Sequence, residues 1–87
     1  MKVEIRQSFS KDALKLPIKI QKEIAAIISA IEEAGKLSEI KSCKKLTGYK
    51  TAYRIRIGNY RLGFFFEDNI VELVRVLARK DTYRFFP

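Results

Sequence analysis

The chain has 87 residues, enough for one domain (residues 1–87) with a single core and no separate cofactor domain. It carries 18 lysines and arginines against 10 aspartates and glutamates, and the net charge of +8 favours a polyanionic partner such as a nucleic acid or a very acidic protein. Histidine is absent, and the one cysteine and four isolated glycines fit no zinc, disulfide or nucleotide-binding motif, so we expect neither a metal nor a cofactor.

A strand and a short helix are predicted first. Val3 and Ile5 alternate with charged residues, as in a strand with one buried face. Ser8 and Ser10 follow as candidate N-caps of a helix that ends near Leu14. The domain therefore begins with β and then α structure.

A longer helix is predicted next. Pro17 suits its first turn, and Gly35 supplies a C-terminal stop. Between them, isoleucines recur at helical spacing and form one apolar stripe: Ile20, Ile24, Ile27, Ile28 and Ile31. Such a stripe requires a sheet to pack against.

Residues 38–51 have no clear hydrophobic period, so we expect a loop there. Cys43 lies in this segment, and we expect it to pack as a small apolar group because no histidine is available to activate its thiol. The segment also carries four lysines that give it a basic flank: Lys41, Lys44, Lys45 and Lys50. This flank is a candidate surface for a nucleic-acid backbone.

Residues 52–66 predict a β-hairpin whose two-residue loop is Gly58-Asn59, because a glycine in the first loop position allows a type II′ turn. This loop pairs Ile57 with Tyr60 and sets Arg56 directly opposite Arg61.

Alternation along the two hairpin strands separates a basic face from an apolar one. Arg54 joins Arg56 and Arg61 on one face, and the other face is predicted to be core: Tyr53, Ile55, Ile57, Tyr60, Leu62, Phe64 and Phe66. A single arginine on such a face is most simply a solvated charge. Three like charges on paired strands are destabilising by themselves, which indicates an anion between them, with phosphate as the first candidate.

The C-terminal part predicts a third strand over residues 70–77 and then a short helical turn within residues 79–87 that packs Phe85 or Phe86 on the sheet. Arg75, in the third strand, is expected either to join the site or to pair with Glu72 or Glu67. The whole is an α+β domain with a short N-terminal strand and two helices packed on an antiparallel sheet that contains a three-stranded β-meander.

Three sequence strings, in this order and spacing, resemble the RelE/ParE superfamily of type II toxins. They are Lys45-Leu46-Thr47-Gly48, the segment from Tyr53 to Leu62 (YRIRIGNYRL), and the segment from Arg79 to Arg84 (RKDTYR). The resemblance spans nearly the whole chain and implies a RelE-like microbial ribonuclease fold. Members that resemble RelE cut messenger RNA in the ribosomal A site, whereas members that resemble ParE inhibit DNA gyrase, and the motifs here are closer to the RelE-like mRNA interferase branch.

The resemblance implies which residues form the site. Carried over by motif, the catalytic set is Arg54, Arg56, Arg61, Arg79 and Tyr83. Ala78 departs from the pattern, because several relatives carry histidine immediately before the last arginine. The proton transfers are therefore left to another group, to solvent or to the ribosome.

Metal-independent RNA cleavage requires charge neutralisation at the phosphate, positioning of a base and proton transfer, and these residues are candidates for each task. Arg61 and Arg79, both expected to be exposed, would neutralise charge on the phosphate oxygens, because guanidinium groups stay protonated and present paired donors. Tyr83 would stack on a base or donate a proton to the leaving oxygen, or it would simply pack on the sheet. Glu67 and Glu72 are alternatives for the general base, or partners of nearby arginines. Other basic residues are expected to contact the RNA backbone: Lys44, Lys45, Lys50, Lys80 and Arg84.

The leading functional hypothesis is a ribosome-dependent endoribonuclease toxin that inhibits translation. The resemblance implies a cognate antitoxin, whose acidic or amphipathic segment covers the basic face in a toxin–antitoxin hetero-oligomer. The alternatives are a gyrase inhibitor and a non-catalytic RNA-binding relative. The sequence has no secretory signal and no apolar run near 18 residues, so we expect a cytoplasmic protein that does not enter a membrane.

Overall fold

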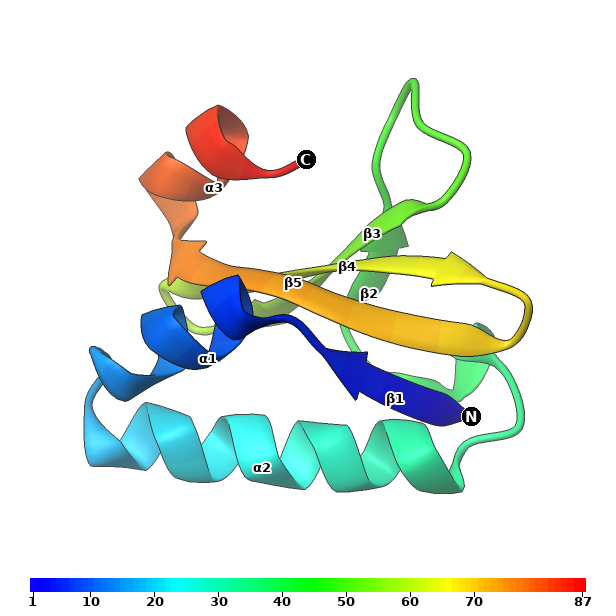
Figure 1. The fold of residues 1–87 in the computed structure, drawn as a ribbon, viewed down its shortest axis with the longest axis horizontal. Helices are drawn as coiled ribbons and strands as arrows, with labels where there is room; N and C mark the ends of the chain where they lie inside the picture. The colour runs from blue at the N-terminus through cyan, green and yellow to red at the C-terminus, as the bar shows by residue number, and fades with distance from the viewer.

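The computed structural model describes residues 1–87 and contains one five-stranded sheet with helices on both of its sides (Figure 1). In chain order the elements are β1 (Lys2–Ile5), α1 (Gln7–Leu14), α2 (Ile18–Glu33), the short 3-10 helix η1 (Leu37–Glu39), β2 (Cys43–Lys45), β3 (Ala52–Ile57), β4 (Tyr60–Glu67), β5 (Ile70–Ala78) and α3 (Arg79–Phe85). None of the helices is both long enough and apolar enough to cross a membrane.

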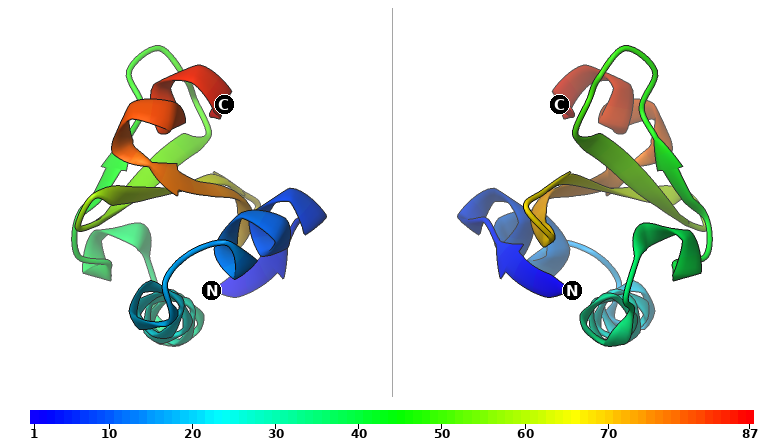
Figure 2. Two further views of the ribbon diagram at one scale, coloured as in Figure 1. Left: turned by 90° about the vertical axis from the view of Figure 1, so that its left-hand side faces the viewer. Right: turned by 90° about the vertical axis from the view of Figure 1, so that its right-hand side faces the viewer.

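The sheet has the strand order β1-β5-β4-β3-β2. Helices α1 and α2 lie on one side of it, while α3 and the loop between β2 and β3 rise on the other side (Figure 2). The predicted α+β fold is therefore confirmed. One pairing departs from the antiparallel prediction, because β1 pairs with β5 in parallel; a parallel pair requires a long connection, and here most of the chain separates the two strands.

The predicted hairpin register is confirmed. Ile57 pairs with Tyr60 and Arg56 with Arg61, and Gly58 has a φ of 56°, as the first position of a type II′ turn requires. The next turn joins β4 to β5 through Asp68 and Asn69, which both have positive φ as in a type I′ turn. Two tight turns thus fix the meander.

A β-bulge divides β5 into two stretches with different side-chain alternation. Gly63 pairs with Arg75 but Phe64 pairs with Leu73, which leaves Val74 as the extra residue. As a result both Leu73 and Val76 are buried in the main core, although three positions separate them, and Val74 packs on the opposite face.

The main core lies between the sheet and the two N-terminal helices. The isoleucine stripe of α2 is confirmed: Ile24 and Ile31 are buried, and the remaining isoleucines of the stripe pack against the same cluster. Phe9 of α1 and Phe64 of β4 fill the centre. Full burial of one such side chain contributes about 1.5 to 3 kcal/mol, and ten of the buried hydrophobic residues belong to this cluster whereas three belong to the cluster on the opposite face.

The predicted helix starts need correction. Helix α1 begins at Gln7 with Arg6 as its N-cap, and neither serine caps it; the Ser8 hydroxyl instead donates a 2.6 Å hydrogen bond to the carbonyl of Val74. Pro17 is the N-cap residue of α2 rather than a member of its first turn. In neither helix does a side chain cap the first turn.

An ion pair joins α1 to the bulged strand. The Arg75 guanidinium donates to both carboxylate oxygens of Asp12 at 2.7 and 3.1 Å, and the backbone N–H of Val76 donates to the same carboxylate at 3.2 Å. The hydrogen bond and the charge of Asp12 raise the pKa of Arg75. The expectation that Arg75 pairs with Glu72 or Glu67 is wrong, since Glu72 pairs with Arg6 at 2.8 Å.

The predicted loop over residues 38–51 contains secondary structure as well. Cys43–Lys45 forms the edge strand β2, with Lys44 paired to Arg54 of β3. Three residues are too few to show a period, so the sequence carried no signal for this strand. Its consequence is that a lysine joins the basic face of the hairpin.

Candidate functional site

Basic side chains from four elements surround one pocket of about 390 Å³, here called the arginine pocket. Its lining comes from β2 and the residue before it, from both strands of the hairpin and from α3: Ser42, Cys43, Lys44, Arg54, Arg56, Arg61, Arg79 and Tyr83. The structure thus brings together all five residues predicted as catalytic and one of the predicted backbone contacts. Their chemical roles stay predictions.

The hairpin turn holds two of the arginines. The Arg61 guanidinium donates to the carbonyls of Gly58 and Tyr60, both at 2.8 Å. The backbone N–H of Arg79 donates to the carbonyl of Asn59, also at 2.8 Å. The glycine that sets the register therefore also helps to place the site.

Arg61 is buried, with 7% of its surface exposed, so the expectation of an exposed side chain is wrong. Strand alternation predicted its face correctly but could not predict that the turn carbonyls and α3 would cover it. Arg79 is exposed, as expected.

No carboxylate pairs with any arginine of this pocket, because the ion pairs of the molecule are Lys2–Glu4, Arg6–Glu72 and Asp12–Arg75. Burial lowers the pKa of Arg61, and the charges of Arg54, Arg56 and Arg79 lower it further. Guanidinium groups still remain protonated near neutral pH, so the pocket holds a concentrated positive charge. An anion bound here would relieve the repulsion among the arginines.

Helix α3 is fixed over the sheet by its C-terminal neighbour. Phe86 is buried and Phe85 is half-exposed, so Phe86 is the residue that packs on the sheet. Its ring covers Gly63 so closely that a Cβ at that glycine would lie 2.5 Å from it. This packing sets the position of Tyr83, which lies on α3 with 72% of its surface exposed.

The arginine pocket continues into a second hollow of about 460 Å³, here called the outer groove. The two share four lining residues, Lys44, Arg54, Arg61 and Tyr83. Lys45 lines the outer groove, as does Tyr49, which the sequence reasoning did not select. Three predicted backbone contacts line neither hollow, although all are exposed: Lys50, Lys80 and Arg84.

Cys43 lines the arginine pocket, which the sequence did not indicate, and it also packs against the main core. Burial raises the pKa of its thiol. A raised pKa disfavours the thiolate, so the thiol is a poor nucleophile, in agreement with the expected packing role.

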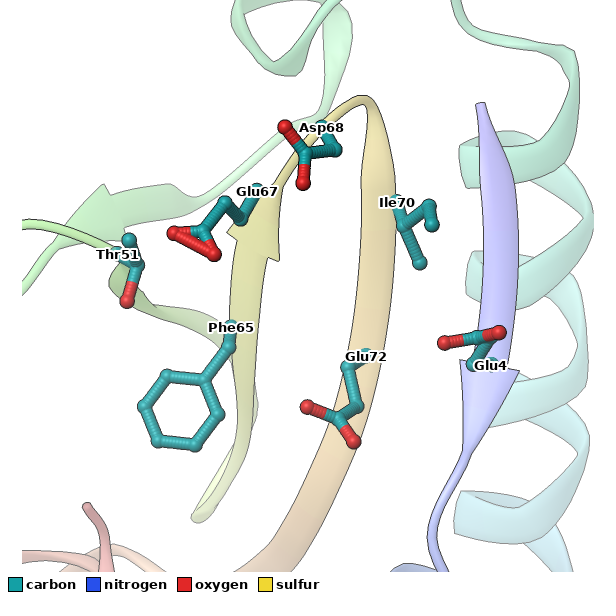
Figure 3. Close-up of a pocket in the computed structure, with 7 residues that line it drawn as sticks. All are labelled: Glu4, Thr51, Phe65, Glu67, Asp68, Ile70 and Glu72. Carbon is teal, nitrogen blue, oxygen red and sulfur yellow. The ribbon is translucent and has the colours of Figure 1, made fainter.

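A separate pocket of about 420 Å³ collects the acidic side chains near the far ends of β4 and β5. Figure 3 shows Glu67 and Asp68 at the β4–β5 turn, Glu72 on β5 and Glu4 on the neighbouring β1. Neither Glu67 nor Glu72 lines the arginine pocket, so the structure does not support either as its general base. No three His, Cys, Asp or Glu side chains lie close enough together to hold a metal ion.

Comparison with known proteins agrees with the resemblance read from the motifs. Residues 3–83 match the family model for the ParE toxin of the type II toxin-antitoxin system parDE. Toxin RelE3 from Methanocaldococcus jannaschii is 40% identical over an alignment of 88 positions that covers 100% of both chains. A chain of the RelB-RelE antitoxin-toxin complex from Methanococcus jannaschii has a TM-score of 0.83 at 36% identity, covering 97% of this chain and 99% of that one. The RelBE2 toxin-antitoxin complex from Mycobacterium tuberculosis contains a chain with a TM-score of 0.67 at 26% identity, covering 92% of each chain. The protein therefore belongs to the RelE/ParE superfamily of type II toxin–antitoxin toxins and is similar to its RelE members.

Proposed function

We propose that this toxin is a ribosome-dependent mRNA endoribonuclease and that the arginine pocket is its active site. The observation that carries the proposal is the convergence of four arginines on one pocket in which no carboxylate pairs with them. Guanidinium groups bind phosphate oxygens through paired donors, and RNA supplies phosphates beside exposed bases. The exposed ring of Tyr83 at the same pocket supplies a stacking surface for such a base.

In the proposed reaction the 2′-hydroxyl attacks the adjacent phosphorus, the bond to the 5′-oxygen breaks, and a cyclic phosphate and a 5′-hydroxyl result. Negative charge grows on the equatorial oxygens as this occurs. Arg61 and Arg79 stabilise that charge, because they are the two arginines that the hairpin turn holds in place. Arg54 and Arg56 hold the flanking phosphate, and Lys44 and Lys45 extend the contact along the RNA backbone.

Tyr83 holds a base unstacked from its neighbours, which brings the scissile phosphate in line with the 2′-hydroxyl. The pocket lining contains neither a carboxylate nor an imidazole, so it offers no ordinary general base. Ala78, which stands where several relatives carry histidine, is the N-cap of α3 next to Arg79. Removal of the 2′-hydroxyl proton therefore depends on another group, on solvent or on the ribosome, and a base supplied by the ribosome would make cleavage ribosome-dependent. Tyr83, in contrast, is the one pocket residue proposed to donate a proton to the leaving oxygen.

The proposal includes a partner. An acidic or amphipathic segment of a cognate antitoxin covers the arginine pocket, because a concentrated unpaired positive charge favours such a segment. The similar chains of known structure come from complexes described as antitoxin-toxin and toxin-antitoxin. A target on translating ribosomes places the free toxin in the cytoplasm.

A second candidate is inhibition of DNA gyrase, which the match to the ParE toxin model favours. In that case the arginines would contact a protein rather than RNA. The two candidates differ in which process stops first in cells after induction, protein synthesis or DNA replication.

The test is primer extension on a defined messenger translated in a purified system. We expect new cuts within codons when wild-type protein and ribosomes are both present. Arg79→Ala removes an exposed guanidinium and should abolish the cuts, whereas Arg6→Gln removes an arginine outside the pocket and should preserve them.

Two outcomes would count against the proposal. Absence of cuts with folded wild-type protein would overturn nuclease activity and favour gyrase inhibition or a relative that has lost catalysis. Ribosome-dependent cuts that Arg79→Ala leaves unchanged would retain the nuclease but remove the arginine pocket as its site.

A further inference from the structure

The outer groove has an aromatic residue to which the proposed function gives no role. Tyr49 lines it together with Tyr83, Lys45 and Arg54. It follows the Lys45-Leu46-Thr47-Gly48 string in the sequence, in the loop between β2 and β3. This loop and α3 rise from the same side of the sheet (Figure 1). Residues of both line the outer groove.

A type II turn fixes the position of Tyr49. Its backbone N–H donates to the carbonyl of Leu46 at 3.3 Å, and Gly48, the third residue of that turn, has a φ of 87°. Leu46 is anchored in turn, because its N–H donates to Ala52 at 2.9 Å and its side chain packs on the small core cluster around Phe86. The turn is therefore attached to the sheet at its start.

The ring of Tyr49 stacks on no other aromatic ring and on no cation in the fold. About half of the residue is open to a ligand, since 52% of its surface is exposed. A large aromatic side chain on a fixed turn loses little conformational entropy when it binds a ligand.

The composition of the outer groove identifies the ligand class. Proteins that bind single-stranded nucleic acid combine cations that follow the backbone with aromatic rings on which successive bases stack. The outer groove has that composition, with Tyr83 at its junction with the arginine pocket and Lys44, Lys45 and Arg54 among its cations.

We propose that Tyr49 is a second base-stacking residue, which binds a nucleobase of the RNA strand adjacent to the base that stacks on Tyr83. The inference rests on the proposed function, since it extends the same RNA path. Lys45 and Arg54 contact the phosphate that joins the two nucleotides. Tyr49 thereby binds and positions the strand without touching the scissile phosphate.

The test measures affinity for a single-stranded RNA of about six nucleotides, end-labelled for fluorescence anisotropy and carrying one 2′-deoxy residue so that the central linkage cannot be cut. Stacking on one aromatic ring is worth about five- to 150-fold in affinity, so Tyr49→Ala should weaken binding at least about fivefold. Tyr49→Phe keeps the ring and should bind like wild type. Leu14→Ala changes an exposed apolar residue on α1 and is the control.

A second arm replaces each base in turn by an abasic nucleotide. At one position the loss caused by Tyr49→Ala should disappear, because the base that stacks on the ring is already missing. If Tyr49→Ala weakens binding of poly-glutamate as much as binding of RNA, the groove is a general anion surface and the stacking proposal is wrong.

Failure of this inference is distinguishable from failure of the proposed function. Wild-type protein that cuts messenger RNA on ribosomes, together with a Tyr49→Ala variant that binds the RNA as tightly as wild type, would overturn only the second stacking site. Wild-type protein that neither binds the RNA nor cuts would overturn both.

Discussion

Arg61 and Arg75 lie on the neighbouring antiparallel strands β4 and β5, but their surroundings are opposite. Arg75 forms a bidentate ion pair with the buried carboxylate of Asp12, and this pairing raises the pKa of Arg75. Arg61 is buried among other arginines without a carboxylate, and its pKa is lowered. The contrast indicates that Arg75, which is paired within the chain, has a structural role, whereas Arg61, which is buried among like charges, is a candidate for binding an anion.

The largest loss of folding stability is expected when Arg75, the arginine paired with Asp12, is removed. Arg75→Ala leaves Asp12 buried with only the Val76 N–H as a donor. Removal of one partner of a fully buried pair costs about 3 to 5 kcal/mol, and this is the upper limit here because Arg75 is partly exposed. Urea unfolding measures this loss, and the RNA-cleavage rate per folded molecule should not change. Asp12→Ala combined with Arg75→Ala should cost less than Arg75→Ala alone. A loss below about 1 kcal/mol would show that the pair behaves like an exposed salt bridge.

Removal of Arg61, which has no carboxylate partner, should lower the RNA-cleavage rate far more than the unfolding free energy. We expect Arg61→Ala to slow RNA cleavage about 100- to 1000-fold, or roughly 3 to 4 kcal/mol, as for the loss of one donor to a developing charge. The two lost hydrogen bonds to turn carbonyls oppose the relief of repulsion, so the unfolding free energy should change by only about 1 kcal/mol. Arg61→Lys keeps the charge without the planar donors and should recover part of the rate. A destabilisation as large as that of Arg75→Ala would remove the contrast between the two arginines.

Gly63 pairs with Arg54 on one side and with Arg75 on the other, so it lies where the two arginine environments meet. Gly63→Ala places a Cβ against the Phe86 ring and should destabilise the protein by about 1 to 3 kcal/mol, the usual cost of overpacking. In a Phe86→Ala background the same change should cost almost nothing. Thermal unfolding of the four proteins in this cycle measures the coupling, and purely additive effects would contradict it.

The smallest change in folding stability should come from the addition of an anion that binds the arginine pocket. Tripolyphosphate at about ten times its Kd should stabilise the protein by about 1.4 kcal/mol, because it binds the folded arginine pocket and not the unfolded chain. A thermal melt measures the shift. Arg56→Gln should reduce this shift in melting temperature. Arg6→Gln should leave the shift unchanged, because Arg6 is already paired with Glu72. Equal shifts in both variants would mean that the anion binds elsewhere.

Local chemistry made the hairpin predictable. Gly58-Asn59 permits few turn types, and each fixes a register, so the facing of Arg56 and Arg61 followed directly from the sequence. The order of the motifs indicated the family and five of the eight residues that line the arginine pocket, although Arg79 and Tyr83 are distant from the hairpin in sequence.

Features that depend on tertiary contacts were not predictable. The bulge at Val74 interrupts alternation, so the partner of Arg75 could not be derived from period alone. Burial of Arg61 depends on turn carbonyls and on α3, and the use of Ser8 depends on Val74 across the fold. Tyr49 was missed because nothing local distinguishes an exposed ring that lines a groove from one that does not.

The parallel pairing of β1 with β5 also has a consequence for the order of events during synthesis. Lys2 pairs with Ile70, so β1 is synthesised long before β5, the strand with which it pairs. Arg79 and Tyr83 follow β5, so the arginine pocket is completed only after all five strands have been synthesised. A growing chain that has reached only β4 lacks both residues and cannot yet form the proposed active site beside the ribosome that is making it.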